Sequence, residues 1–254
     1  MNKGDIFSNN KGFKFTVLEY INTRKVKIVF DSGYERYSAV KEIRNGGIKD
    51  KLSPSVFGVG INDVSHQVTK YEIISGKRKL VWCCPYYSKW HGMLQRCYSK
   101  PLKIKYPTYE SCIVQEDWKY FSNFKKWIDI QDNTDWNNCD LDKDLLITGN
   151  KIYSENTCIF IHPIINDFLK ETEAKRGDTL IGCSVDKRTG KYKAECSNLF
   201  CEERSGRYIG TYNTELEAHL AWKERKHELA CELASSIYVT SEEVRRALTN
   251  RWCG

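Results

Sequence analysis

Apolar and polar residues alternate along the first part of the chain. Between residues 14 and 40 the stretches FTVLEYI, VKIVF and GYERYSAV show this alternation, and turn-forming residues at 22–23 and 31–33 separate them. This pattern is typical of antiparallel strands. We predict a small antiparallel β-module over residues 1–60. Residues 61–85 continue a stretch rich in Gly, Ser and Pro, which indicates a linker or long loop.

The middle of the chain changes to helical spacing. Two groups of apolar residues recur at intervals of one, three and four, namely Trp90, Met93, Leu94 and Cys97, then Phe121, Phe124, Trp127 and Ile128. Such spacing places a group on one face of a helix. The pattern predicts two amphipathic helices, whose aromatic side chains we assign to the core.

A strand, loop, strand and helix are predicted next. Residues 141–147 and 158–161 read as short strands, TGNKIYSENT lies between them, and a helix is expected from about Pro163 because proline favours the first helical position. This unit belongs to a module spanning residues 86–172. An acidic residue on its first strand and a polar residue on its helix can meet at one cation.

The C-terminal part predicts three strands and a long helix over residues 178–236. Thr214 and Glu217 have the spacing of a capping box, which marks the start of the helix. If Tyr192, Ala194 and Cys196 face that helix, alternation leaves the other sheet face open to solvent. A short helix from Ser241 and a tail occupy residues 237–254. The fold class is therefore α+β.

Composition restricts the class of protein. The 254 residues are 41% hydrophobic and 29% charged, which is typical of a packed chain. No stretch approaches the ~20 consecutive apolar residues of a membrane span, and the first residues lack the apolar core of a signal peptide. We expect no membrane partner and a location in the cytoplasm.

Charge is spread unevenly. The net charge is +7, and residues 1–80 hold 15 basic and 8 acidic side chains. The basic residues of the β-module indicate either a phosphate-facing surface or solvated strand exteriors. An acidic cluster follows in the middle of the chain, at Asp132, Asp135, Asp140, Asp142 and Asp144. It indicates either oxygen ligands for a divalent cation or a solvated loop.

Eleven cysteines occur, without a CxxC pair. In a chain without an export signal they are expected to be reduced. Burial as small apolar residues is the favoured interpretation, and the alternative is a structural zinc site at Cys97, Cys112, Cys139 and Cys158.

The order of three motifs carries a family resemblance. YSKWHGMLQRCY (87–98), YPTYESCIVQEDWKYFSNFKKW (106–127) and LDKDLLITGNKIYSENTCIFIHPIIN (141–166) resemble bacteriophage proteins of the HNH, or homing-endonuclease-like, superfamily. Residues 181–230 resemble the Apetala-type DNA-binding domain that often follows such a module. The resemblance implies double-stranded DNA as partner and an infected bacterial cell as location.

The HNH resemblance implies a catalytic centre with one divalent metal ion. Asp142 falls on the first-strand ligand and Asn166 on the helix ligand, so the expected cofactor is Mg²⁺. Lys143 occupies the position of the general-base His, and Thr157 that of the central Asn. Three interpretations of Lys143 stay open: a base, a phosphate contact in a site that does not cut, or an ion pair with Asp142 or Asp144.

The Apetala resemblance implies that the sheet reads a DNA major groove. The residues expected to contact DNA are Lys187, Arg188, Lys191, Lys193, Glu195, Ser197, Arg207 and Tyr208, with Gly206 where an Arg is expected. Arg207 is one residue out of phase, so its direction depends on a local bulge. A fold kept for protein contacts alone is the alternative.

Three functions are compatible with these patterns. The first is a DNA-binding protein resembling a homing endonuclease, which hydrolyses phosphodiesters with one Mg²⁺. The second is a sequence-specific DNA binder or regulator that does not cut. The third is a protein that binds and inhibits a host or rival protein through the aromatic-rich middle of the chain. The sequence leaves the oligomeric state open.

Overall fold

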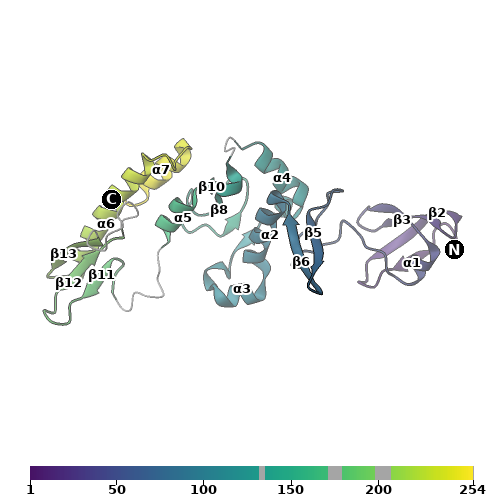
Figure 1. Cartoon of the computed structure of the whole chain (residues 1–254), viewed down its shortest axis with the longest axis horizontal. Helices are drawn as coiled ribbons and strands as arrows, with labels where there is room; N and C mark the ends of the chain where they lie inside the picture. The colour runs from purple at the N-terminus through teal and green to yellow at the C-terminus, as the bar shows by residue number, and fades with distance from the viewer. Residues whose placement is uncertain (132–134, 171–178, 198–206, 254) are drawn as a thin grey trace. The chain divides into compact units, whose positions relative to one another are not determined.

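The computed structural model describes residues 1–131, 135–170, 179–197 and 207–253. They form two compact units, unit 1 (Met1–Ile130) and unit 2 (Gln131–Gly254). Both units combine helices with antiparallel strands (Figure 1), which confirms the predicted α+β class. The division between the units falls inside the predicted module 86–172. The predicted module limits stay predictions about which segments fold independently.

Unit 1 begins with a four-stranded antiparallel sheet in the order β1-β2-β3-β4. Its strands are β1 (Ile6–Ser8), β2 (Lys14–Asn22), β3 (Lys25–Phe30) and β4 (Glu35–Ser38), and the short helix α1 (Val40–Arg44) follows. The alternating positions fill one core, made of Phe15, Val17, Val26, Ile28, Phe30, Ile43 and Ile48. The hydrophobic alternation thus leads directly to this sheet.

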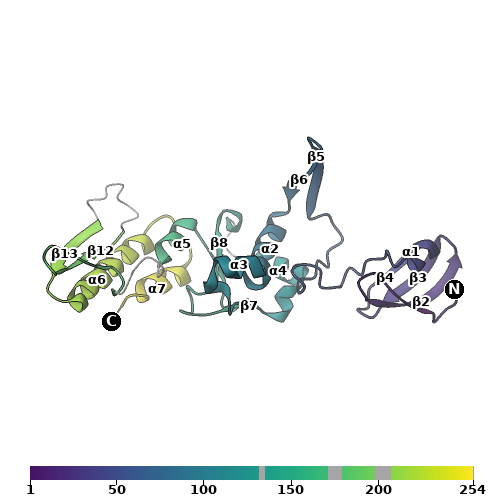
Figure 2. The ribbon, with the colours of Figure 1, turned by 90° about the horizontal axis from the view of Figure 1, so that it is seen from below.

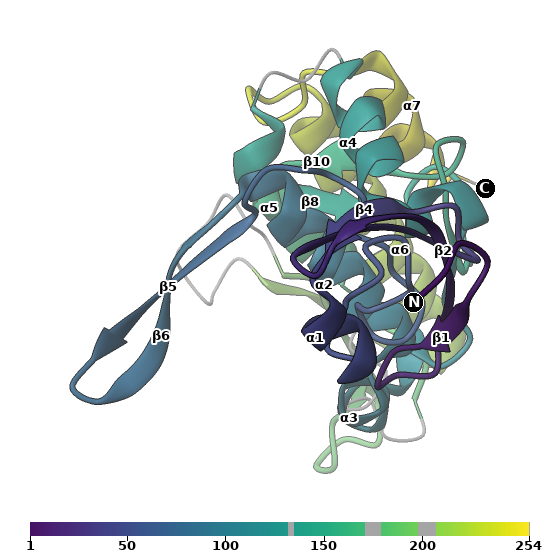
Figure 3. The ribbon, with the colours of Figure 1, turned by 90° about the vertical axis from the view of Figure 1, so that its right-hand side faces the viewer.

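The segment expected to be a linker or loop contains a β-hairpin. Strands β5 (Thr69–Ile74) and β6 (Lys77–Cys83) pair antiparallel, with a bulge at Lys70/Tyr71. Ser75 and Gly76 connect them with φ of +52° and +71°, the backbone of a two-residue type I′ turn. We call this hairpin the β5–β6 ribbon. Figures 2 and 3 show it projecting away from α2 and α4.

The remainder of unit 1 is mainly helical. Its elements are α2 (Pro85–Tyr98), α3 (Lys100–Lys105), η1 (Pro107–Tyr109), β7 (Ile113–Val114), η2 (Glu116–Lys119) and α4 (Phe121–Asp129). The predicted apolar faces of α2 and α4 are buried, aromatic side chains included. The indole N–H of Trp90 donates to the carbonyl of Trp118 at 2.7 Å. These aromatics therefore act as core, as the helical spacing predicted.

Unit 2 contains the remaining strands and helices. These are η3 (Trp136–Asn138), β8 (Asp140–Asp142), β9 (Ile152–Tyr153), β10 (Ile159–Ile161), α5 (Pro163–Leu169), β11 (Cys183–Val185), β12 (Tyr192–Glu195), β13 (Tyr208–Tyr212), α6 (Glu215–Ala234) and α7 (Glu242–Asn250). One core joins them, from Leu145 and Ile161 through Trp222 and Leu233 to Trp252. The predicted limits at 172 and 236 both lie inside the stretch that shares this core.

The predicted strand at residues 141–147 is wrong in length. β8 ends at Asp142. The carboxylate Oδ1 of Asp142 accepts hydrogen bonds from the backbone N–H groups of Asp144 and Leu145 at 2.9 and 2.7 Å. An aspartate that captures the next amides turns the chain and removes those amides from a strand ladder. The acidic side chain therefore ends the strand that the apolar residues would continue.

Helix α6 begins where the capping box predicted. Thr214 Oγ1 accepts the N–H of Glu217 at 3.2 Å, and Glu217 accepts the N–H of Thr214 at 3.1 Å, so the capping box is confirmed. Leu216 is 59% exposed, whereas Lys226 is buried. The buried stripe runs through residues 218, 222, 226, 229, 230 and 233, and Leu216 lies off it.

Within the described ranges, no helix combines the length and the apolar character that crossing a membrane requires.

Candidate functional site

Two places in unit 2 contain the residues that the resemblance singles out. The first is the segment formed by β8, the following loop, β10 and α5, which we call the β8–α5 segment. β8 and β10 are antiparallel, with Asp142 opposite Ile159 and Asp140 opposite Ile161. Because side chains alternate along a strand, Asp140 and Asp142 lie on one face, and the buried Leu141 lies on the other.

Asp142 is a largely enclosed carboxylate at the end of β8. Burial raises the pKa of Asp142, and the nearby carboxylate of Asp144 raises it further. The N–H groups of Leu145 and Asp144 and the charge of Lys143 act in the opposite direction. The carboxylate thus fixes the local backbone, although burial and the charge of Asp144 both disfavour its ionised form.

Lys143 forms an ion pair inside the fold. Its side chain is only 7% exposed, and Nζ donates to Asp144 Oδ2 at 2.8 Å. Nζ also lies 5.8 Å from the ring centroid of Tyr153. Of the three interpretations of Lys143, this geometry favours the ion pair with Asp144, because the ammonium is enclosed and already bonded to that carboxylate.

Asn166 contacts a different aspartate from the one predicted. The amide Nδ2 of Asn166 donates to Asp140 Oδ2 at 2.8 Å, and α5 packs against β8. The amide therefore faces the first residue of β8, whereas Asp142 Oδ1 bonds to the following turn. The structure brings strand and helix together, but it pairs Asn166 with Asp140.

The loop between β8 and β9 is fixed by Asn150, a residue that the family resemblance did not single out. The Asn150 amide donates to the carbonyls of Lys143 and Ile152 at 2.6 and 2.7 Å, and its Oδ1 accepts the N–H of Ile152 at 3.2 Å. Thr157, at the position of the central Asn, donates its hydroxyl to the carbonyl of Ile152 at 2.7 Å. The Gly149-Asn150 pair was the available signal for this turn.

His162 caps α5. Its Nδ1 accepts the N–H of Ile164 at 3.3 Å, and its ring centroid lies 4.7 Å from that of Tyr238. These contacts give it a structural role at the start of the helix.

The described residues offer no preformed metal site. No group of three or more His, Cys, Asp and Glu side chains placed to hold a metal ion occurs among them. Asn166 donates its amide N–H to Asp140, and Asp142 Oδ1 accepts two backbone N–H groups, so each of the two expected Mg²⁺ ligands is bonded to a different group of the fold. Of the zinc candidates, Cys97 and Cys112 belong to unit 1, and Cys139 and Cys158 to unit 2; all four are buried.

The second place is the three-stranded sheet β11-β12-β13, whose strands all contact α6. Ala194 and Cys196 are buried, whereas Lys191, Glu195 and Ser197 are exposed and Lys193 is half-buried. One face of β12 thus packs against the helix, and the alternate residues point away from it. The sheet leaves an open face, which we call the open sheet face.

The predicted DNA contacts group around this face. Lys187 and Arg188 are exposed in the β11–β12 turn, close in sequence to Lys191. Lys193 Nζ lies 3.2 Å from Asp186 Oδ2. The Arg188 N–H and this ammonium lower the pKa of Asp186. Lys187, Arg188 and Lys191 are exposed cations at or next to the β11–β12 turn.

A bulge between Ala194 and Glu195 sets the direction of the next strand. It pairs Glu195 with Tyr208, and the Tyr208 hydroxyl lies 2.8 Å from Thr211 Oγ1. Arg207 is exposed, and its carbonyl accepts the N–H of Cys196. Tyr208 is therefore on the side of Glu195, and Arg207 stays one residue out of phase with it. Gly206 and Asp132 lie outside the described residues.

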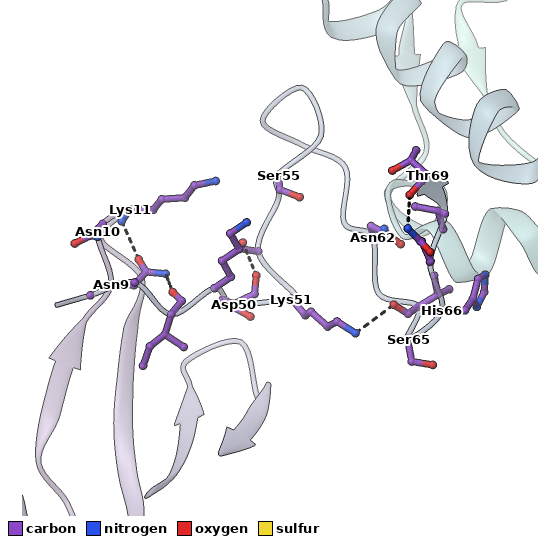
Figure 4. Close-up of a pocket in the computed structure, with 18 residues that line it drawn as sticks. Asn9, Asn10, Lys11, Asp50, Lys51, Ser55, Asn62, Ser65, His66 and Thr69 are labelled. Atoms are coloured by element: carbon purple, nitrogen blue, oxygen red, sulfur yellow. Dashed lines mark hydrogen bonds between the residues drawn. The ribbon is translucent and has the colours of Figure 1, made fainter. Parts of the chain in front are cut away.

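A polar cavity of about 660 Å³ lies in unit 1 beside the N-terminal sheet (Figure 4). Lys11, Lys49 and Lys51 line it together with the buried Asp50. Lys51 Nζ donates to the carbonyl of Val64 at 3.4 Å, and Asp50 Oδ1 accepts the N–H of Leu52 at 2.9 Å. These polar groups hold neighbouring loops, and the predicted site residues lie elsewhere.

No family model, curated protein or solved structure matches this chain. The HNH and Apetala resemblances therefore stay predictions.

Proposed function

We propose that this chain binds double-stranded DNA through the open sheet face and does not cut it. Three exposed cations at the β11–β12 turn support the proposal: Lys187, Arg188 and Lys191, which we call the sheet edge. They lie beside a sheet that α6 covers only on its other side. Exposed cations on one surface are suited to phosphates, and a sheet can enter a major groove.

The proposal that DNA is not cut rests on the hydrogen bonds and ion pair of the polar residues in the β8–α5 segment. Lys143 is paired with Asp144, Asn166 with Asp140, and Asp142 with the backbone of its own turn. A general base must be able to accept a proton, and metal ligands need free oxygen lone pairs directed at one point. These residues are engaged in holding the fold.

The test is binding of the full chain to a mixed-sequence 20-base-pair duplex at several salt concentrations, by fluorescence anisotropy. The variant Lys187→Gln/Arg188→Gln/Lys191→Gln removes three cations from the sheet edge. Each lost phosphate contact reduces the slope of log K against log salt by about 0.9, so we expect a reduction of about 2.7. Arg246→Gln on α7, a side chain 75% exposed, is the matched control and should keep the slope.

Two results would contradict the proposal. The first is an affinity of the unaltered chain that does not depend on salt. That result would favour the third function, a protein partner. The second is an unchanged slope in the variant that lacks Lys187, Arg188 and Lys191, which would show that the sheet edge is not the contact surface.

Metal-dependent cleavage is the second candidate function. One observation favours it: the strand, loop, strand and helix form as the HNH resemblance implies, with Asp142 at the end of the first strand. Its test is nicking of supercoiled plasmid in Mg²⁺ and then in EDTA. Nicking that disappears in Asp142→Ala, with DNA binding unchanged, would replace the proposal of a binder that does not cut.

A further inference from the structure

The β5–β6 ribbon is solvent-exposed over nearly its whole length. Every residue of both strands is exposed except Thr69 and Cys83, at the end next to α2. An isolated two-stranded hairpin is marginally stable in water, and exposed strand edges invite association. Figures 2 and 3 show the ribbon standing away from α2 and α4. A surface of this kind indicates a partner.

The strand register separates two different faces of the ribbon. Glu72 lies opposite Lys79 and Ile74 opposite Lys77, while Lys70 lies opposite Trp82, so these six side chains share one face. That face carries three lysines and one glutamate together with Ile74 and Trp82, which are 41% and 47% exposed. Lys70 is 2.8 Å from Glu72, whereas Lys77 and Lys79 form no ion pair with any described residue.

The opposite face is apolar. It holds Tyr71, Ile73 and Leu80, whose exposed fractions are 44%, 72% and 52%. Arg78 lies on the same face, with its guanidinium 4.0 Å from the ring centroid of Tyr71. The cation thus covers part of the aromatic ring and stays available at the tip of the ribbon.

We propose that the β5–β6 ribbon inserts into the major groove of double-stranded DNA, as a second contact besides the open sheet face. The proposal rests on the proposed function. The apolar face lies toward the base edges, where thymine methyl groups offer apolar contact. Arg78 at the tip of that face, and Lys77 and Lys79 on the other face, extend their long side chains to the flanking phosphates.

The width and the net charge of the β5–β6 ribbon support this proposal. Two strands ~4.8 Å apart, with their side chains, match a groove ~12 Å wide and ~8.5 Å deep. The 15 residues from Thr69 to Cys83 hold four cations and one anion, a net charge of +3 opposite the phosphates. The bulge at Lys70/Tyr71 adds to the twist of the ribbon, which helps it follow a helical groove.

The position of the charges favours DNA over a membrane surface. A hairpin that inserts into a bilayer presents apolar residues at its tip. Here the turn Ser75-Gly76 is followed at once by Lys77, Arg78 and Lys79, so insertion would carry three charges into hydrocarbon. On DNA the same three charges would contact phosphates while still exposed to water, so no charge would have to enter hydrocarbon.

The experiment compares three full-length variants on one duplex. Lys77→Gln/Arg78→Gln/Lys79→Gln should reduce the salt slope by about 2.7, which corresponds to about 500-fold weaker binding at 0.1 M salt if the affinities converge at 1 M. The charge-conserving variant Lys77→Arg/Arg78→Lys/Lys79→Arg should keep the slope. The sheet-edge variant should show its own separate loss. Hydrogen exchange of the hairpin amides shows whether each ribbon variant keeps its fold.

The outcomes separate this inference from the proposed function. A wild-type slope in the glutamine ribbon variant, with loss in the sheet-edge variant, overturns the inference and leaves the proposed function standing. An unaltered chain without salt-dependent binding overturns both. Ribbon-dependent binding to phosphatidylserine vesicles, or a ribbon-dependent dimer in light scattering, would assign the ribbon to a membrane or to a second copy and overturn its assignment to DNA.

Discussion

Gly182 occupies a position where both the backbone and the space exclude a side chain. It precedes β11 with φ of +78°, a left-handed conformation that costs an L-residue about 1–2 kcal/mol. A Cβ there would lie 2.0 Å from Trp222 Cγ and 2.6 Å from Trp222 Cβ. Trp222 is 7% exposed in the core of unit 2. Overpacking of a core typically adds about 1–3 kcal/mol, so Gly182→Ala should destabilise unit 2 by about 2–5 kcal/mol.

The matched control is Gly190→Ala. Gly190 has a similar φ of +69°, but no atom lies within 4 Å of the Cβ it would gain. It should therefore lose only the backbone contribution, about 1–2 kcal/mol. Urea unfolding of both full-length variants, followed by circular dichroism, gives the two free energies. Equal losses would refute the reasoning, because the contact with Trp222 would then contribute nothing.

Two further predictions concern buried charges in unit 2. Lys226→Met removes the donor that lies 2.7 Å from the Phe168 carbonyl, so the free energy of unfolding in urea should fall by about 1–3 kcal/mol. Lys226→Arg keeps a donor and should lose less stability. An equal loss in both variants would contradict this reasoning. The raised pKa of Asp142 means that the folded state binds more protons than the unfolded state, so its contribution to stability falls as pH rises above about 4. The stability of Asp142→Asn relative to the unaltered chain should therefore increase from pH 4 to pH 7, and a constant difference would contradict the assignment.

The elements with strong periodicity were predictable from sequence. The alternation in residues 14–40 leads to a sheet whose core contains alternate apolar residues of that stretch, and the helical groups on α2 and α4 are buried as predicted. Thr214 and Glu217 likewise mark the start of α6. In each case the signal lies within one element, so no knowledge of its neighbours is needed.

The β5–β6 ribbon was missed because its pattern is irregular. The bulge at Lys70/Tyr71 shifts the pairing, and Ile73 and Ile74 stand side by side, so strict alternation is absent. Ser75-Gly76 is also a weaker turn signal than Asn-Gly. The neighbouring residues rich in Gly, Ser and Pro then favoured a loop.

Buried polar pairs depend on tertiary structure that no local pattern contains. The ammonium of Lys226 donates a hydrogen bond to the backbone carbonyl of Phe168, at the end of α5 and 58 residues away in the chain, which allows its burial. The partner of Asn166 depends on how α5 packs on β8. Asp140 and Asp142 lie two residues apart on one strand face, so sequence spacing could not choose between them.

The acidic cluster provides the last argument on function. Within the described residues each of its aspartates already has an internal partner: Asp135 accepts from Asn138, Asp140 from Asn166, Asp142 from the N–H groups that follow it, and Asp144 from Lys143. These bonds fix the direction of each carboxylate, and no three of the described His, Cys, Asp and Glu side chains are grouped to hold a metal ion. The same partners anchor the loop that ends β8 and its contact with α5. We therefore assign the cluster a structural role in unit 2, and our proposal places the contact with phosphates on the exposed cations of the open sheet face and the β5–β6 ribbon.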